Sequence, residues 1–198
     1  MRKVYEMSYK KEILGEQVTN DEKIFSIYEL HTDIIVKGGR DVQFGHKVNF
    51  AGGKSNLILD CKIHRGNPSD KILYRPTLDR VIENYQLIPR DITTDGGYAS
   101  LKNLVYTQKL GVKNIVFNKI VGSLQNITSS KRMTTILKKW RSGIEAVISN
   151  LKRGYGLRTC NWKGWEHFQS KVLWSTIAYN IRVMTSKLLE IFIKPVTV

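Results

Sequence analysis

The chain opens with a polar stretch, residues 1–23, and short hydrophobic runs follow it. Residues 24–28, 44–50 and 56–63 are short runs with apolar side chains between turn residues, which is typical of strands. A glycine-containing turn at residues 51–55 separates the last two runs. The pattern therefore predicts an irregular or helical lead-in, a first strand and then a hairpin.

The middle of the chain changes to helical spacing. Apolar residues recur every three or four positions from Ile72 to Tyr85. Ser69 or Asp70 stands just before them, where its side chain can cap the free amide groups of a first helical turn. A helix is predicted here, and it should end before Pro89 because proline cannot continue it.

A strand, a helix and a second strand are predicted next, at residues 92–95, 100–110 and 114–117. Such a βαβ unit has parallel strands and a right-handed crossover. Two long helices, at about residues 130–152 and 165–189, complete the chain, and the second is expected to be buried and amphipathic. This order of elements predicts a mixed α/β sheet covered by helices.

Charge divides the chain into two unlike halves. Residues 1–95 hold 15 basic and 14 acidic side chains, whereas residues 96–198 hold 17 basic and 3 acidic ones. Because so many positive charges repel one another, the second half is expected to meet a polyanion, and nucleic acid is the leading partner. A solubilising surface is the alternative, although such surfaces mix both signs. An anionic membrane is less suitable, because the basic residues are spread over several elements.

A hydrophobic content of 41% over 198 residues can supply one buried core, which favours a single globular unit. The N-terminus lacks the apolar stretch of a signal peptide, and residues 172–193 carry too much charge for a membrane-spanning helix. A cytoplasmic location without membrane contact is therefore predicted. Cys61 and Cys160 are isolated and the four histidines are scattered, which predicts reduced, structural thiols and no zinc site.

Asp95 stands at the end of a predicted strand and directly before Gly96 and Gly97. Two glycines allow a sharp turn, so the carboxylate can be exposed at the carboxyl edge of the sheet, where open α/β folds bind ligands. This is the geometry of a metal site. An ordinary Asp-Gly turn is the alternative interpretation.

Glu145 is the only acid between Gly96 and Trp165, a segment with thirteen lysine or arginine residues. On a helix, Arg141, Glu145 and Lys152 share one face because they are four and seven residues apart. A carboxylate between two cations can present a metal ligand beside groups that hold phosphates. The alternative is an arginine–glutamate pair on a solvated helix, which contributes only about 0.2–0.5 kcal/mol.

Asp95 and Glu145 together have the composition of a phosphodiester-processing site. Such chemistry uses two divalent ions about 4 Å apart, held by carboxylates. Mg²⁺ and Mn²⁺ prefer oxygen ligands, so an acid at a strand end and one on a facing helix are the expected pair. Their carboxylates should then lie within about 8 Å of each other.

Six ordered motifs resemble DDE-type insertion-sequence transposases, in particular the ISNCY-like subgroup. Arg141-Ser142-Gly143-Ile144-Glu145 followed by Lys152 resembles their C-terminal signature, and the sequence DGGYAS at residues 95–100 resembles the segment around their second catalytic aspartate. The other similar motifs are GHKV at 45–48, GNPSD at 66–70, LKRGYGLR at 151–158 and CNWKG at 160–164. The similarity covers about residues 24–190.

The resemblance implies a ribonuclease H-like α/β fold and Mg²⁺- or Mn²⁺-dependent cleavage and strand transfer at the double-stranded DNA ends of a transposon. It assigns Asp95 and Glu145 as the second and third metal-binding acids. Arg141 and Lys152 correspond to basic residues that contact DNA near the cleaved phosphate. The full set of implied DNA-binding residues is Lys138, Lys139, Arg141, Lys152, Arg153 and Arg158.

Two departures from the family pattern are visible. Lys138 replaces the aromatic residue that usually opens the signature, with Trp140 close by. The strand carrying the first catalytic aspartate belongs upstream of the first predicted strand, and no such strand precedes it here. The resemblance therefore predicts an N-terminally truncated, inactive remnant without the first central strand. Asp33 and Asp41 do not end a suitable apolar strand, although they and Asp60 are the candidates if the chain proves active.

This interpretation divides the chain into a polar lead-in at residues 1–23, an incomplete catalytic domain at 24–190 and a tail at 191–198. Intact transposase or another copy of the chain are further implied partners. A different class of function is a non-catalytic basic DNA-binding protein that competes with or joins an intact transposase. An RNA-binding protein is a third hypothesis, but no aromatic RNA-binding motif is visible. Metal dependence distinguishes the first hypothesis from the others.

Overall fold

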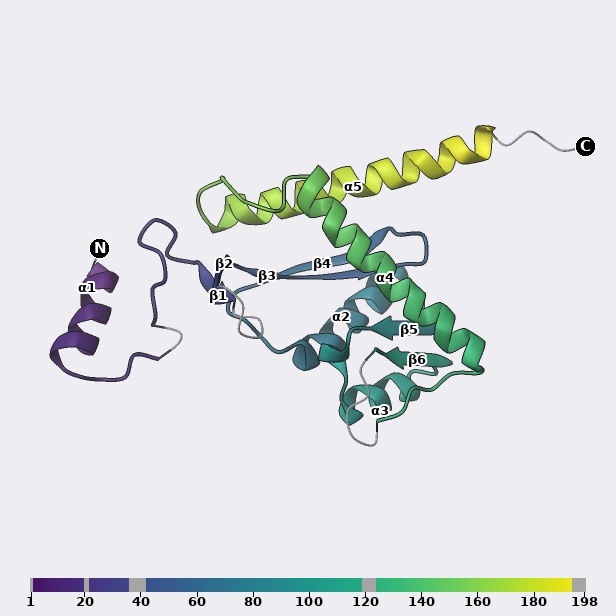
Figure 1. The fold of residues 1–198 in the computed structure, drawn as a ribbon, viewed down its shortest axis with the longest axis horizontal. Helices are drawn as coiled ribbons and strands as arrows, with labels where there is room; N and C mark the ends of the chain where they lie inside the picture. Colours follow the sequence, from purple (N-terminus) through teal and green to yellow (C-terminus); the bar gives the residue numbers. More distant parts are fainter. Residues whose placement is uncertain (1, 20–21, 36–41, 119–123, 194–198) are drawn as a thin grey trace, which may run out of the picture.

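The computed structural model describes residues 2–19, 22–35, 42–118 and 124–193, with the side chains of 191–193 excepted (Figure 1). The elements in chain order are α1 (Arg2–Ser8), the π-helical turn η1 (Tyr9–Ile13), β1 (Asp33–Ile35), β2 (Gln43–Gly45), β3 (Lys47–Gly52), β4 (Ile58–His64), α2 (Asp70–Tyr85), β5 (Asp91–Thr94), the 3₁₀ turn η2 (Gly96–Tyr98), α3 (Leu101–Lys109), β6 (Asn114–Phe117), α4 (Lys131–Gly154) and α5 (Trp165–Ile193).

The predicted α/β class is confirmed, but the strands of the described residues form three two-stranded sheets and not one mixed sheet. β1 pairs with β2 and β3 with β4, both antiparallel, while β5 and β6 are parallel with Ile92 opposite Ile115. The predicted hairpin and the βαβ unit are therefore present. Each of β3 and β5 pairs with one described strand and leaves its other edge unpaired, so the two pairs of strands are not joined into a single mixed sheet.

α3 and α4 begin at serines that cap them, whereas Ser69, which precedes α2, makes no side-chain capping hydrogen bond, so the predicted cap of α2 is not formed by its side chain. The Ser100 hydroxyl accepts from the Asn103 amide at 3.1 Å at the start of α3, and Ser130 accepts from the Met133 amide at 3.1 Å at the start of α4. α2 ends where Gln86 adopts a left-handed conformation (φ 50°), before Pro89 as predicted.

Residues 24–28 form no strand, so that prediction is wrong. Ile27 is 64% exposed and Tyr28 is 86% exposed, and neither residue pairs with a strand of the described residues. The helical expectation for the polar lead-in is met by α1 and η1, which lie apart from the body of the molecule (Figure 1).

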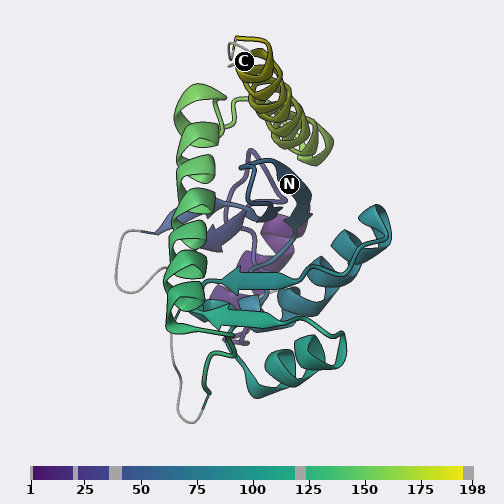
Figure 2. The ribbon, with the colours of Figure 1, turned by 90° about the vertical axis from the view of Figure 1, so that its right-hand side faces the viewer.

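Two clusters of buried side chains make the core. One joins α2, α3 and β6, and its members include Tyr74, Leu104, Ile115 and Phe117. All four residues of β6 are buried, as expected for a strand covered on both faces. The second cluster joins β4, α4 and α5 through the residues Ile58, Val147, Leu151 and Tyr179. Figure 2 shows that α4 runs past β5 and β6 and also reaches the neighbourhood of α5.

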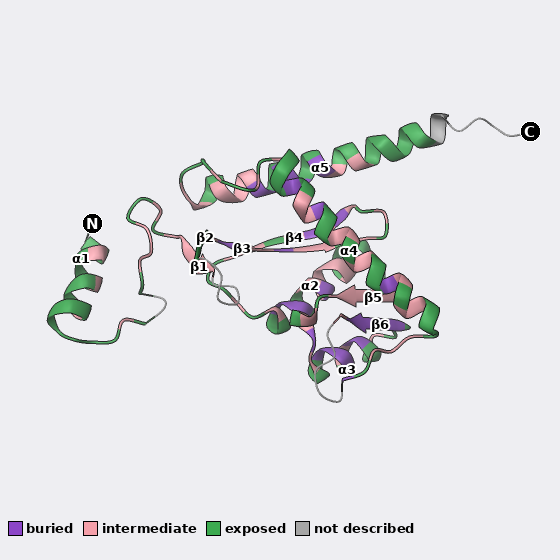
Figure 3. Cartoon of the chain, in the orientation of Figure 1, coloured by how far each residue is buried: buried purple, intermediate pink, exposed green. Residues whose placement is uncertain are grey.

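α5 differs from the buried helix that its sequence predicts. Its buried residues Val172, Thr176 and Tyr179 face the body, but every side chain from Met184 to Glu190 is exposed (Figure 3). The C-terminal part of the helix extends beyond the other elements (Figure 1). Among the described residues, no helix has the length and apolar character needed to cross a lipid bilayer.

Candidate active site

Asp95 lies where β5 ends and η2 begins. Its backbone is still extended, and its carboxylate Oδ1 accepts a 2.7 Å hydrogen bond from the Gly96 amide, which caps the 3₁₀ turn. The Tyr98 amide donates to the Asp95 carbonyl oxygen at 3.2 Å and closes the turn. The strand end and the short turn together hold the Asp95 side chain on the surface, with 65% of it exposed.

α4 carries Arg141 and Glu145, and its middle packs closely against the β3–β4 hairpin. A side chain added at Gly143 would come within 3.2 Å of the Asn56 Oδ1, and one at Gly52 would come within 3.0 Å of the Ile144 side chain. Glycine at these two positions therefore permits the close approach. Because α4 also contacts β5, the approach fixes the face of α4 that meets the Asp95 turn.

A single guanidinium contacts both candidate acids. Arg141 Nη2 donates to Glu145 Oε1 at 2.5 Å, and Arg141 Nε lies 3.6 Å from Asp95 Oδ1. The contact between Arg141 and Asp95 is an ion pair but is too long for a hydrogen bond. The buried Nε–H of Arg141 therefore has no hydrogen-bond acceptor among the described residues. Two carboxylates fifty positions apart in the sequence thus converge on one cation.

The Tyr98 hydroxyl links the turn that carries Asp95 to β3. The Tyr98 hydroxyl donates a 2.6 Å hydrogen bond to Asn49 Oδ1, and the Asn49 amide donates to the Thr77 hydroxyl. Burial raises the pKa of Tyr98 to about 12, and the nearby Asp70 and Asp95 carboxylates act in the same direction. Tyr98 is therefore a neutral donor throughout the physiological range.

Asp70 is a third carboxylate near the turn. It contacts Gly97, where no side chain could be added without displacing it, and it forms an ion pair with Lys47 Nζ at 2.5 Å. Its sequence position suggested only a helix cap, and the role of Asn49 was not foreseen either. The motifs around both residues were visible in the sequence, but their proximity to Asp95 depends on how β3 and α2 pack.

A profile of the transposase DDE domain matches residues 35–181, which is most of the chain. The chain belongs to the transposase DDE domain family. Neither the comparison with curated proteins nor that with solved structures gives a match. Asp95, Glu145 and every predicted DNA-binding residue lie within the matched transposase domain.

The other acids considered for the transposase domain are engaged elsewhere or are outside the described residues. Asp60 is buried and accepts two hydrogen bonds from Arg80, at 3.1 and 2.7 Å. Asp33 accepts from His46 Nδ1 and from the Gly66 amide, both at 2.8 Å. Asp41 lies outside the described part of the chain. Within that part, no group of three or more histidine, cysteine or acidic residues is arranged to hold a metal ion.

The predicted DNA-binding residues of the transposase domain are mostly solvent-exposed. Arg141 is half-buried between the two acids, whereas the remaining members of the set are exposed along α4 and the turn after it. These exposed residues are Lys138, Lys139, Lys152, Arg153 and Arg158. Lys54 Nζ lies 5.8 Å from the Trp140 ring centre, so the hairpin turn adds another cation beside this surface.

Proposed function

We propose that this transposase domain acts on the phosphodiester bonds of double-stranded DNA at transposon ends, with Asp95 and Glu145 as two of its metal-binding acids. The proposal includes membership of the ISNCY-like subgroup, which rests on the six sequence motifs. It also includes a cytoplasmic location. The observation that carries it is the convergence of Asp95 and Glu145 on the Arg141 guanidinium.

The donor atoms of this cluster fit a hard divalent cation. Asp95 and Glu145 offer carboxylate oxygens on two sides of a positive charge, and Mg²⁺ and Mn²⁺ take oxygen ligands. These two residues would hold the ion, and its bound form would polarise a phosphate oxygen and the attacking hydroxyl. Tyr98 supports the turn that carries Asp95, because its hydroxyl is anchored on Asn49.

Arg141 is suited to a phosphate. Its Nε–H lacks a hydrogen-bond acceptor among the described residues, and a guanidinium binds phosphate oxygens in a planar, two-point manner. Lys138, Lys139, Lys152, Arg153 and Arg158 would neutralise phosphates along the duplex on either side of this point. The acids then face the same phosphate that Arg141 binds.

We propose further that the site is incomplete and that catalysis needs a third acid. The support is the pair of unmatched edges of β3 and β5, since an additional strand pairing there would end near Asp95. With two ligands the metal affinity is low, because it depends on the number of carboxylates. The alternative function, a non-catalytic basic protein that competes with or joins an intact transposase, is favoured by the +14 charge of residues 96–198.

Metal binding and cleavage test the assignment. Binding of Mn²⁺ to the purified chain, measured by electron paramagnetic resonance, should be weak and should be lost in Asp95→Ala and in Glu145→Ala. Glu166→Ala, which removes an exposed acid from the first turn of α5, is the matched control and should leave binding unchanged. Nicking of supercoiled plasmid with Mg²⁺ or Mn²⁺ should stay at background. Mn²⁺ binding that survives both site substitutions would refute the metal assignment.

DNA binding tests the basic surface independently of the metal. Duplex DNA should bind with a dissociation constant of about 10⁻⁴–10⁻⁶ M near physiological salt, and the affinity should fall as salt rises. The double variant Lys152→Glu/Arg153→Glu should weaken binding by at least about tenfold, whereas Lys3→Glu, at an exposed site on α1, should have little effect. Affinity that does not change with salt would contradict the nucleic-acid proposal.

A further inference from the structure

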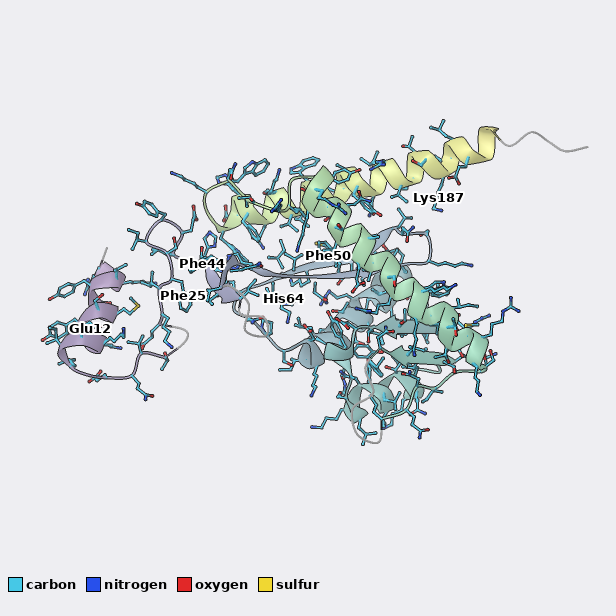
Figure 4. All side chains as sticks on the ribbon, viewed as in Figure 1. Glu12, Phe25, Phe44, Phe50, His64 and Lys187 are labelled. Carbon is cyan, nitrogen blue, oxygen red and sulfur yellow. The ribbon has the colours of Figure 1, made fainter. Side chains whose placement is uncertain are left out.

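Two histidines and two carboxylates form a continuous chain of polar contacts outside the candidate active site. We call it the histidine clasp, and its members in order are Glu29, His31, His46 and Asp33. The three contacts between successive side chains measure 2.8, 2.7 and 2.8 Å. Figure 1 shows that the segment before β1, the start of β3 and the start of α5 meet at one end of the β3–β4 hairpin, and Figure 4 places Phe44 at that end. No side chain of the clasp is more than 29% exposed, and that of His46 is only 2% exposed.

The clasp joins segments that are far apart in the sequence. Glu29 Oε2 also accepts a 3.0 Å hydrogen bond from the amide of Gly164, the residue directly before α5. A carboxylate is favourable there because a helix N-terminus carries partial positive charge. At the other end of the clasp, Asp33 Oδ2 accepts a 2.8 Å hydrogen bond from the Gly66 amide, in the loop before α2. The clasp thus fastens residues 29–33 to the body and to the start of α5.

Aromatic rings of α5 enclose His46. The ring centroids of Trp165 and Phe168 lie 4.8 and 4.9 Å from that of His46. The guanidinium carbon of Arg65 lies 4.6 Å from the Trp165 ring centre. The titratable and charged groups that act on His46 are Asp33, His31 and Arg65. Burial is the largest influence and lowers the pKa of His46 below its ordinary 6.5, and the Asp33 carboxylate opposes this shift only in part.

The number of ring protons decides whether the clasp is closed. A neutral imidazole has one N–H and an imidazolium has two, whereas an ionised carboxylate only accepts. Two neutral rings keep the bond between the rings and one bond to a carboxylate, and one imidazolium beside one neutral ring completes all three contacts. Two imidazolium rings carry one N–H too many, so two N–H groups face each other across the 2.7 Å contact between His31 and His46. That contact cannot persist, because neither nitrogen is then an acceptor.

We propose that the histidine clasp is an acid-operated switch, which is closed while at most one of its two rings is charged and opens when both are charged. Opening parts His31 from His46, withdraws Glu29 from the Gly164 amide and releases residues 29–33 from the start of α5. The closed clasp binds fewer protons than the open one, so a falling pH favours opening. Because the buried His46 resists protonation, the switch opens below pH 6.5.

Nuclear magnetic resonance of the ¹⁵N-labelled full chain, without DNA or metal, tests this proposal between about pH 8 and about pH 5. In wild type, the signals of the Gly164 amide and the Trp165 indole should both shift as the pH falls, and both shifts should follow the protonation of His46. At about pH 5, the Gly164 amide should exchange with solvent at least about tenfold faster in wild type than in His46→Gln.

His46→Gln and His31→Gln distinguish the switch from a purely structural contact. A glutamine amide has one donor group and one acceptor and takes up no proton in this range. The ring that remains in either variant can be charged without meeting a second N–H, so each variant should stay closed at about pH 5. His167→Gln is the matched control, because His167 is exposed on α5 outside the clasp, and this variant should open like wild type.

Far-UV circular dichroism should show an unchanged helix content over the same pH range, because the clasp opens within a folded chain. Loss of helix content together with the resonance changes overturns the proposal, since the whole chain then unfolds. Signals that do not change with pH also overturn it, as does an equal change in both glutamine variants or a clasp that is open at every pH in both. With DNA and metal absent, none of these outcomes bears on the proposed transposase chemistry.

Discussion

The attachment of α5 to β4 by Asn180 gives a quantitative prediction. The Ile58 amide donates to Asn180 Oδ1 and the Asn180 amide donates to the Ile58 carbonyl oxygen, so one side chain satisfies both polar groups of a residue that is only 5% exposed. Asn180→Leu keeps a similar side-chain volume but leaves both groups unpaired. A buried unsatisfied group costs about 1–3 kcal/mol. Asn180 itself is only half-buried and water can relax around it, so a loss of about 2–3 kcal/mol is expected.

Urea unfolding followed by circular dichroism measures this loss. Asn180→Asp is the informative companion, because it retains the acceptor for the Ile58 amide but sets a carboxylate oxygen against the Ile58 carbonyl oxygen, so it should also destabilise the chain. Asn150→Leu changes the same residue type at an exposed position of α4 and should stay within about 0.5 kcal/mol of wild type. If Asn180→Leu also stays within that range, the two hydrogen bonds do not hold α5 in place, and the exposure of its apolar residues Trp174, Ile177 and Ile181 loses its explanation.

Three further predictions concern other parts of the fold. Burial lowers the pKa of His46 below its ordinary 6.5, and the Asp33 carboxylate offsets this only in part, so the folded state favours the neutral imidazole. The contribution of neutral His46 to folding stability is therefore present above pH 6.5 and is lost as the pH falls below that value. The melting temperature should fall between pH 8 and pH 5, and it should fall less steeply in His46→Gln. Gly97→Ala should destabilise the chain by about 1–3 kcal/mol in chemical denaturation, because the added methyl group displaces Asp70. Gly154→Ala is the control, and it should be neutral or slightly stabilising because its methyl group meets open space. Burial raises the pKa of the Cys61 thiol to about 11, so iodoacetamide at pH 8 should leave Cys61 unmodified in the native chain and label it only after unfolding. Peptide mass spectrometry reads the labelling, and rapid labelling of the native chain would show that Cys61 is accessible as a thiolate.

Local sequence patterns determined most of the secondary structure. The serines at positions 100 and 130 cap their helices through contacts three residues away, and such contacts need no tertiary partner. β6 could be predicted because Ile115, Val116 and Phe117 form an apolar run after Asn114, and the predicted bounds coincide with the strand. The excess of positive charge in the second half was also visible, because net charge does not depend on the fold.

The candidate site was only partly determined in this way. The sequence put Asp95 at a strand end and Glu145 on a helix face with Arg141, since strand and helix periods fix those positions. It could not show that one guanidinium meets both acids, because this depends on the packing of α4 at Gly143. For the same reason it missed Asn49 and Asp70, which reach the Asp95 turn from other elements.

Tertiary structure alone decided which surfaces pair and which stay open. Residues 24–28 have strand composition but form no strand, because a strand needs an edge to pair with and the sequence of one segment does not supply it. The strands form three sheets instead of one, since pairing depends on how the helices place each pair of strands. α5 has apolar residues on more than one face, so its pattern could not say which face the body covers. The hydrogen bonds of Asn180 to Ile58 decide that, and they leave Trp174, Ile177 and Ile181 in solvent.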